Sequence, residues 1–209
     1  MPFEQMFKNQ TKFADIMMKC RADLHSILGV LVMLGASALG FNLALSASLD
    51  TPSHLRLIDR LDRPQDGYCL DIPGAPPNIR VELPLFAHNC MTSLTIDTSV
   101  VLTSDGYIRF PNVKRCVTVM GIHSSLPGAT VRLGECNPPN PFIDISKLQR
   151  FTHHPDGRLT LTDTDLCLSV GSRSAETLSP IHRWRTLFVE DCAVAKPARS
   201  RWEFIVPKG

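Results

Sequence analysis

The sequence CLDI at residues 69–72 decides the fold, because variants of it recur as CVTV at residues 116–119 and CLSV at residues 167–170. A second cysteine follows each copy, at separations of 21, 20 and 25 residues. A period of about 50 residues that occurs three times indicates three copies of one supersecondary unit. The cysteine pairs are Cys69 and Cys90, Cys116 and Cys136, and Cys167 and Cys192.

Each copy predicts two short strands, one at the first cysteine and one leading into the second. The second strands are expected at Val81–Leu83, Val131–Leu133 and Thr186–Val189. Two Asp-Gly turns, Asp105-Gly106 and Asp156-Gly157, each stand 11 residues before the first cysteine of a copy. Short strands bounded by turns at this spacing predict an all-β fold, a sandwich or a barrel.

The two ends of the repeated region are expected to pair. Leu55 and Leu57 alternate with Arg56, and the segment 202–206 alternates in the same way, which is the period of a β-strand. Pairing of these segments would close the sheet and remove its exposed edges. Because one copy cannot bury its apolar face alone, the three copies are expected to share one core.

Composition and motifs exclude several classes of function. The chain of 209 residues has a net charge of +2 and no basic stripe with interleaved aromatic residues, so nucleic acid is not an expected partner. It lacks a Cys-x2-Cys pair, a Gly-x-Ser-x-Gly motif and a phosphate-binding loop, so we expect no metal, no cofactor and no catalytic residue. Glycosidases use a pair of carboxylates, and Asp71 with Asp97 is such a pair, but nothing in the sequence indicates the large cleft that a glycosidase needs.

An apolar segment precedes the repeats. Residues 24–49 carry no formal charge, and residues 27–49 are predicted to be either a transmembrane helix or the apolar region of a signal peptide, after a cytoplasmic leader at 1–26. A buried core helix is disfavoured because the run is long and lies outside the repeats. The six paired cysteines indicate an oxidising compartment, so the protein is expected to be membrane-anchored facing such a compartment, or secreted or periplasmic after cleavage.

The pattern resembles the ricin B-type lectins, whose fold is a β-trefoil. The resemblance covers residues 50–207, with lobes at approximately 54–104, 105–155 and 156–207. It rests on the three cysteine segments, the Asp-Gly turns and remnants of a Gln-x-Trp signature. These remnants are Thr98-Ser99-Val100, Gln149-Arg150-Phe151 and Ser200-Arg201-Trp202.

The repeated pattern also predicts which residues are structural. The six cysteines are expected to form three disulfides within the lobes, each closing a loop of about 20 residues and contributing ~3 kcal/mol in the chain-entropy model. Phe151 and Trp202 are expected to lie in the core, because the signature positions of the family pack inward.

The resemblance implies sugar binding, to galactose-type or xylan-type glycans, in a shallow pocket of the first lobe. Asp71, two residues after the first cysteine, takes the position of the carboxylate that accepts hydrogen bonds from sugar hydroxyls. His88 takes the position of the aromatic platform, with Phe86 two residues earlier on the same strand face. Asp97 and Thr98 take the positions of the polar partners. Since His88 is small and Asp97 lacks an amide donor, the expected affinity is millimolar, about 4 kcal/mol.

The other lobes lack this set, and alternatives stay open. Thr118 and Gly134 replace the carboxylate and the ring in the second lobe, and Ser169 and Glu190 replace them in the third. We therefore expect no sugar binding there. In the first lobe, Asp71 alternatively caps the backbone N–H groups of the turn that follows it. The whole domain is alternatively a degenerate trefoil that binds an unknown protein.

Overall fold

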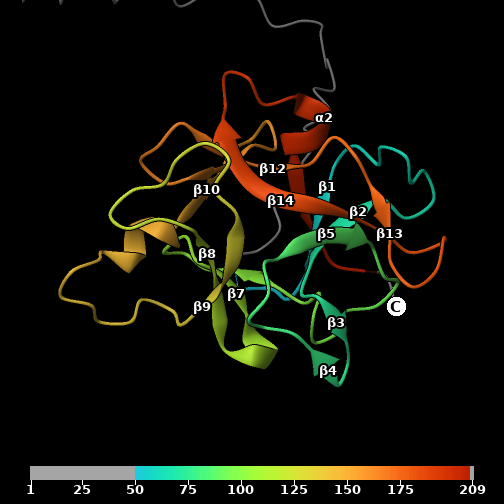
Figure 1. The fold of residues 1–209 in the computed structure, drawn as a ribbon, viewed down its shortest axis with the longest axis horizontal. Coiled ribbons are helices and arrows are strands. Elements are labelled where there is room, and N and C mark those ends of the chain that lie inside the picture. The colour runs from blue at the N-terminus through green and yellow to red at the C-terminus, as the bar shows by residue number, and fades with distance from the viewer. Residues whose placement is uncertain (1–49, 208–209) are drawn as a thin grey trace, which may run out of the picture. The chain divides into compact units, whose positions relative to one another are not determined.

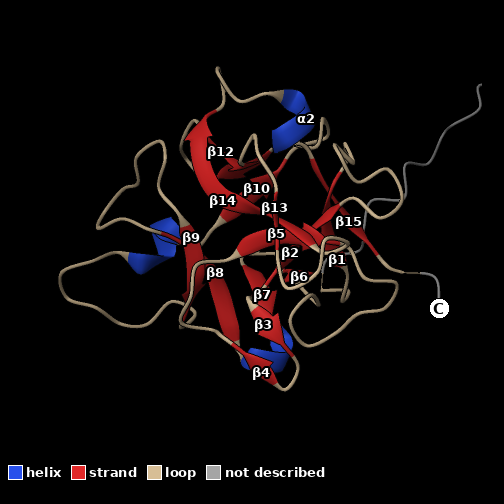
Figure 2. Ribbon diagram, turned by 45° about the vertical axis from the view of Figure 1, so that its right-hand side comes forward, coloured by secondary structure: helices blue, strands red, loops and turns tan. Residues whose placement is uncertain are grey.

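Antiparallel strands make up most of the regular structure in the computed structural model, which describes residues 50–207. The predicted leader at 1–26 and apolar segment at 27–49 lie outside the described residues. Within residues 50–207, no helix is both long enough and apolar enough to cross a bilayer. The short helices η2, η3 and α2 lie at the periphery of the strands (Figure 2). They span Pro111–Val113, Ile145–Leu148 and Pro197–Ser200.

The strands form one large sheet, one smaller sheet and a separate hairpin. In the large sheet, β14 lies between β12 and β5, so that it joins the strands of the third lobe to those of the first (Figure 1). The order of the large sheet is β10 (Phe151–His153), β11 (Leu159–Leu161), β12 (Leu166–Val170), β14 (Arg183–Asp191), β5 (Phe86–Asn89), β2 (Tyr68–Asp71), β1 (His54–Leu57) and β15 (Trp202–Ile205), with β13 (Ala175–Glu176) on β14. The smaller sheet is β6 (Val101–Leu102), β7 (Ile108–Phe110), β8 (Arg115–Val119) and β9 (Val131–Gly134), and the hairpin is β3 (Gly74–Ala75) with β4 (Asn78–Ile79).

The predicted pairing of the two ends is confirmed. β1 and β15 are antiparallel neighbours, with Leu57 opposite Trp202. The smaller sheet is joined to the larger by isolated bridges rather than by a continuous ladder. These bridges are Ser53 with Val100, Pro84 with Arg132, Tyr107 with Arg150, and Thr130 with Phe188.

One backbone hydrogen bond repeats three times and shows that the signature remnants occupy equivalent positions. In the second and third lobes, the last residue of the remnant donates its N–H to the glycine carbonyl of the Asp-Gly turn. Gly106 and Gly157 have φ angles of 87° and 85°, which a residue with a Cβ rarely adopts. The three bonds are Val100 to Ser53 (2.9 Å), Phe151 to Gly106 (2.8 Å) and Trp202 to Gly157 (2.7 Å).

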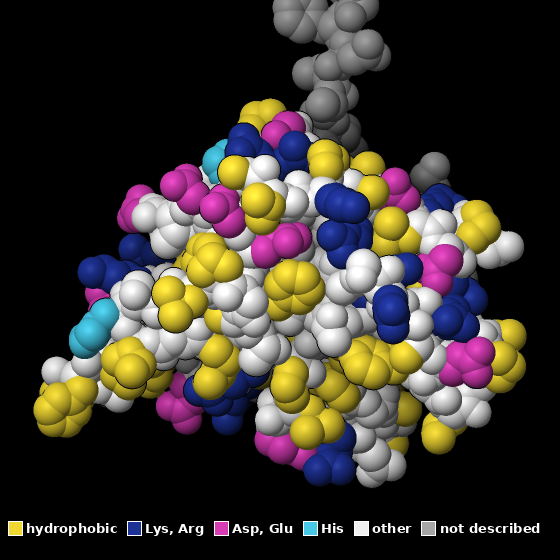
Figure 3. Space-filling view, turned by 45° about the horizontal axis from the view of Figure 1, so that its top comes forward, with side chains coloured by type: hydrophobic (Ala, Val, Ile, Leu, Met, Phe, Trp, Pro, Cys, Tyr) yellow, Lys and Arg dark blue, Asp and Glu magenta, His cyan; other side chains and the backbone are white. Residues whose placement is uncertain are grey.

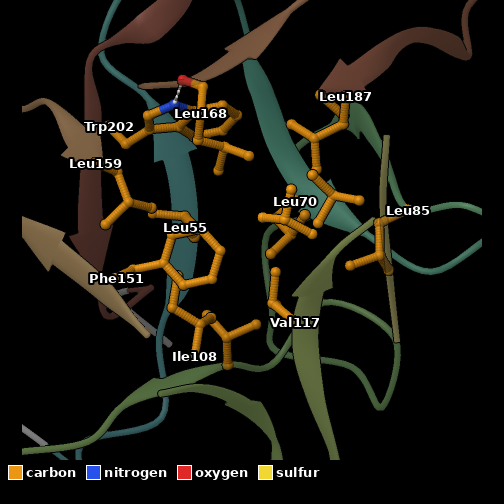
Figure 4. Packing of buried hydrophobic residues seen from close by; sticks show 14 of the residues in the cluster. Leu55, Leu70, Leu85, Ile108, Val117, Phe151, Leu159, Leu168, Leu187 and Trp202 are labelled. Carbon is orange, nitrogen blue, oxygen red and sulfur yellow. Dashed lines mark hydrogen bonds between the residues drawn. The ribbon is translucent and has the colours of Figure 1, made fainter. Parts of the chain in front are cut away.

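The core lies between the lobes and draws side chains from all of them (Figure 4). Phe151 and Trp202 are 3% and 0% exposed, which confirms the prediction that the signature positions pack inward. Trp202 also donates its indole N–H to the carbonyl of Leu168 at 2.9 Å, so its one polar atom is satisfied inside the core.

The three predicted disulfides are confirmed. Each one joins the two cysteines of a single repeat, so the crosslinks staple each lobe rather than one lobe to another. The pairs are Cys69–Cys90, Cys116–Cys136 and Cys167–Cys192.

One local prediction is wrong. Val81–Leu83 is not a strand, although its residues alternate; it forms a turn in which Leu83 donates to the carbonyl of Arg80, and the strand before Cys90 is β5 instead. Pro84 follows this turn and lacks the N–H that a ladder needs. The third lobe has in addition the short strand β13, which pairs with the first residues of β14.

Replacing Trp202 with alanine should lower the free energy of unfolding by about 3–5 kcal/mol, because it empties a fully buried site. Trp202→Phe retains most of the apolar volume but loses the hydrogen bond to Leu168, so about 1–2 kcal/mol should be lost. Urea denaturation measures both. The chain's other tryptophan, Trp184, is half-buried, and Trp184→Ala is the matched control, with less than half the effect. An equal effect at both tryptophans would contradict the assigned core.

Candidate functional site

Strand register brings three of the sequence-predicted site residues to one outer face of the first lobe, the lobe stapled by Cys69–Cys90. Asp71 at the end of β2 lies opposite Phe86 on β5, and Cys69 lies opposite His88. Directly opposed residues of an antiparallel pair point to the same side of a sheet. Their neighbours Leu70 and Ala87 face the core. The alternation of β2 and β5 therefore turns the candidate site outward.

The carboxylate of Asp71 lies deep in this face. Asp71 is 5% exposed; its Oδ2 lies 3.2 Å from Nδ1 of His88, and its Oδ1 has no hydrogen-bond partner among the described residues. The N–H of Ile72 donates to the carbonyl of Asp97 at 3.2 Å, and it also lies close enough to the Asp71 carboxylate to lower the pKa of Asp71. Oδ1 of Asp71 is thus a buried acceptor without a hydrogen-bond partner among the described residues.

Burial raises the pKa of Asp71 from 3.8 to about 6. The contact with His88 works in the opposite direction, and the charge of Asp97 adds to the increase. A pKa of about 6 corresponds to about 3 kcal/mol of penalty on the ionised form. The first lobe therefore keeps a carboxylate at a position where a neutral side chain would be more stable.

The two remaining residues of the sequence-predicted site, Asp97 and Thr98, form hydrogen bonds within their own loop. Asp97 and Thr98 are both buried. Oδ1 of Asp97 accepts a hydrogen bond from the hydroxyl of Thr95 at 2.5 Å, and Oγ1 of Thr98 accepts one from the Thr95 N–H at 3.1 Å. Asp97 lies close enough to Asp71 to influence its pKa, but its side chain is engaged within the segment 95–98.

Trp184 also lies at the site, although no sequence pattern indicates it. It stands on β14, opposite His88 of β5, and its ring packs edge-on against Phe86 with 6.1 Å between centroids. Trp184 belongs to the third repeat, so neither cysteine spacing nor the family pattern places it beside the first lobe. Only the register of β14 against β5 reveals it.

A histidine from the same segment covers the predicted platform. The ring of His182 stacks on His88, with centroids 5.6 Å apart and an interplanar angle of 15°. One face of His88 is therefore occupied, while Phe86 and Trp184 remain partly exposed beside it.

A buried arginine holds β14 against the first lobe. Arg185 lies over the ring of Tyr68 at 4.9 Å and donates to Asp62 at 2.6 Å and to the Gly171 carbonyl at 2.7 Å. Partial burial tends to raise the pKa of Asp62, but hydrogen bonds from Ser174, Arg185 and Tyr68 hold that pKa well below its usual range. Since Arg185 follows Trp184 directly, this network positions the indole.

A groove of about 510 Å³ runs beside the Phe86 and Trp184 rings. Its lining is mostly apolar, which suits the C–H faces of a ligand better than its hydroxyl groups. Besides the two rings, the apolar lining residues are Pro73, Leu83, Pro84, Leu85 and Leu187.

The equivalent face of the second lobe is filled by protein. Thr118 and Gly134 occupy the carboxylate and ring positions there, as the register of β8 with β9 shows. The fully buried amide of Gln149 donates to Thr118 Oγ1 at 2.9 Å and to the Glu135 carbonyl at 2.7 Å. In this lobe the site is closed.

The third lobe has a different arrangement. Ser169 lies opposite Phe188, and Cys167 lies opposite Glu190. The Ser169 hydroxyl and Oε1 of Glu190 are buried, with no hydrogen-bond partner among the described residues. The carboxylate of this lobe thus stands at the ring position of the first lobe.

Family comparison agrees with this geometry. Residues 59–186 match the model of the ricin-type β-trefoil lectin domain. The chain belongs to this family. The matched range includes the first two disulfides and the candidate site with Asp71, His88 and Trp184. No curated protein matches this lectin-family chain.

Solved structures share the fold of this lectin-family chain. It is similar to the agglutinin from Abrus precatorius, with a TM-score of 0.52 and 20% identity, covering 75% of this chain and 49% of that chain, so it spans about half of the agglutinin's length. It is similar to the mdaA-1 domain (TM-score 0.52, 15% identity, 78% and 94% covered). A β-trefoil lectin of the Vibrio vulnificus hemolysin/cytolysin, with N-acetyl-D-lactosamine bound, gives a TM-score of 0.49 at 16% identity (76% and 98% covered).

The raised pKa of Asp71 predicts a pH-dependent effect of Asp71→Asn. In the native protein, the protonated carboxyl is favoured by folding, so its stabilising contribution is complete below pH 3.8 and is lost as the pH rises through about 6. Relative to Asp71→Asn, the free energy of unfolding of the native protein should therefore fall by about 3 kcal/mol between pH 3.5 and pH 7.5. Urea denaturation across this range measures the difference.

Ser169→Ala is the matched control for this measurement, because it lies at the equivalent position of the third lobe and removes no titratable group. Its difference from the native protein should not change with pH. A constant difference for Asp71→Asn as well would show that the carboxyl is not destabilised by burial.

Proposed function

We propose that this lectin-family chain is a carbohydrate-binding protein whose site for neutral sugars lies on the outer face of the first lobe around Asp71. The observation that carries the proposal is the buried carboxylate of Asp71, whose Oδ1 has no partner among residues 50–207 and whose neighbours are aromatic rings. A carboxylate acceptor beside aromatic faces is the combination that sugar recognition requires. The chain acts as a binding module rather than as an enzyme.

In this proposal, adjacent hydroxyl groups of the sugar donate to Asp71, and the apolar C–H face packs on Phe86 and Trp184. The groove beside these rings accommodates the neighbouring part of the glycan. His182 has to leave His88 before a ligand uses the ring of His88. The segment 177–182 that carries His182 is attached through the two-residue strand β13, so its displacement breaks few contacts.

The ligands proposed are galactose-type or xylan-type glycans, and the site is proposed to face an oxidising compartment. The three disulfides support that compartment. Retention of residues 27–49 as a membrane anchor, or their removal with secretion of the rest, belongs to the same proposal. On the face in Figure 3, Lys and Arg side chains are interspersed with acidic and hydrophobic ones, a distribution that favours glycan over nucleic acid.

A second candidate function is binding of a protein by a degenerate trefoil. It is favoured by the closed site of the second lobe and by exposed apolar side chains in its loops, of which Leu126 and Phe142 are 74% and 78% exposed. Absence of glycan binding, together with a partner retained in a pull-down and lost in Leu126→Ser and Phe142→Ser, would support this function.

A glycan array followed by titration of the strongest ligand tests the first proposal. Asp71→Asn should lower the affinity at least tenfold, because each lost hydrogen bond to a charged acceptor is worth about 1.5–3 kcal/mol. Ser169→Ala should leave it unchanged. Binding should also weaken from pH 7.5 to pH 5, where Asp71 becomes protonated. Undiminished binding by Asp71→Asn would place the sugar elsewhere.

Removal of the His182 ring, which covers the ring of His88, tests a separate part of the proposal. His182→Ala should raise the affinity for the same glycan several-fold, because the ligand no longer displaces His182 from His88. Calorimetric titration at pH 7.5 measures this. A lower affinity in His182→Ala would show that His182 contacts the sugar rather than excluding it.

A further inference from the structure

A second pocket, of about 550 Å³, lies on the third-lobe side of Trp184. The rings of Trp184 and Phe188 contribute to its lining, and the guanidinium groups of Arg173 and Arg199 contribute its charge. It shares Trp184 and Thr186 with the groove beside Phe86, but its other lining residues all differ, and neither Asp71 nor His88 is among them.

The two arginines are not neutralised within the part of the chain that the structure describes. Arg173 is exposed and has no ion pair there, and Nε of Arg199 is buried without a hydrogen-bond partner. The side chain of Arg199 is partly exposed and lines the pocket, so its guanidinium group and that of Arg173 are placed to pair with a bound anion.

Nearby carboxylates are either committed elsewhere or outside the pocket. Asp62 pairs with Arg185 at 2.6 Å and lies 3.6 Å from Arg183, and Glu176 lies 3.3 Å from Arg183. Glu190 lies further along β14 and does not line the pocket. Among the described lining residues none is acidic, so the pocket carries two positive charges.

We propose that this pocket binds an acidic saccharide, a sugar that carries a carboxylate or sulfate group. The guanidinium groups of Arg173 and Arg199 take the anionic group, since their planar forks match the oxygens of a carboxylate or sulfate. Trp184 takes the apolar face of the sugar ring. The hydroxyls of Ser172 and Thr186, which also line the pocket, are available to the ring hydroxyl groups.

The third lobe departs from neutral-sugar recognition in a way that fits this chemistry. A serine stands where the first lobe has its carboxylate, and α2 brings a cation to the same face. The proposal does not rest on the first-lobe site, because its charge comes from different residues and its ligand has the opposite requirement: an anion in place of hydroxyl donors.

Titration of the full-length protein with 3′-sialyllactose, a sulfated chondroitin disaccharide and neutral lactose tests the proposal. At least one acidic saccharide should bind about tenfold or more tightly than lactose at physiological salt. Arg199→Gln and the exposed Arg173→Gln should each reduce that binding about tenfold or more, since each removes charge-assisted hydrogen bonds. 3′-Sialyllactose carries a carboxylate, whereas the chondroitin disaccharide carries a carboxylate and a sulfate, so tighter binding of the disaccharide would show a contribution from sulfate.

Two control variants make the result specific. Arg132→Gln removes an exposed arginine at the position of the second lobe that corresponds to Phe188, and Asp71→Asn removes the first-lobe acceptor. Arg132→Gln should leave binding of the acidic saccharide unchanged, and Asp71→Asn, which weakens binding of neutral galactose-type glycans at the first-lobe site, should retain the preference for the acidic saccharide over lactose. Equal affinity for lactose, or an equal loss in Arg132→Gln and Arg199→Gln, would overturn the proposal. Loss in Asp71→Asn alone would assign the acidic saccharide to the first-lobe site.

Discussion

The pairing of β14 with β5 is the contact on which both candidate sites depend. It carries a strand of the third repeat onto the first, and Arg185 fixes the crossing by packing on Tyr68 while it donates to Asp62 and to Gly171. Because Arg185 and Trp184 are adjacent and point to opposite sides of the strand, burying the guanidinium directs the indole outward. The position of the Trp184 ring beside Phe86 at the surface is therefore a consequence of the buried polar network around Arg185.

Comparison of the lobes separates structural from functional uses of the same position. In the second lobe, Thr118 meets the amide of Gln149, and that amide's Oε1 also accepts the N–H of Asn137, so the buried polar groups satisfy one another. In the first lobe, Asp71 keeps an unpartnered oxygen and a pKa raised by burial. The fold itself does not require this arrangement, since the second lobe folds without it. An uncompensated buried acceptor is what a site retains when its partner comes from a ligand.

The sequence allowed the fold to be predicted further than the site. The disulfides and the closure of β1 on β15 follow from spacing and alternation, which are local patterns, and the burial of Trp202 follows from the resemblance to the lectin signature. Val81–Leu83 alternates as well, but the turn ahead of Pro84 prevails there over the strand period. Trp184 was missed because its neighbour His88 is 96 residues away in the chain, and no local pattern encodes the register between strands of different repeats.

The different constraints on the inner and outer faces explain why three copies share one fold but not one surface. The inner positions need only an apolar side chain of suitable volume, so Val100, Phe151 and Trp202 perform the same role despite their different sizes. The outer positions contribute little to the core and are free to change in charge and shape. They are Asp71, Phe86 and His88 in the first lobe, Thr118, Arg132 and Gly134 in the second, and Ser169, Phe188 and Glu190 in the third. Divergence on one face of a repeated strand pair is thus sufficient to leave one lobe with a buried, unpartnered carboxylate oxygen and to fill the same position of another lobe with glutamine.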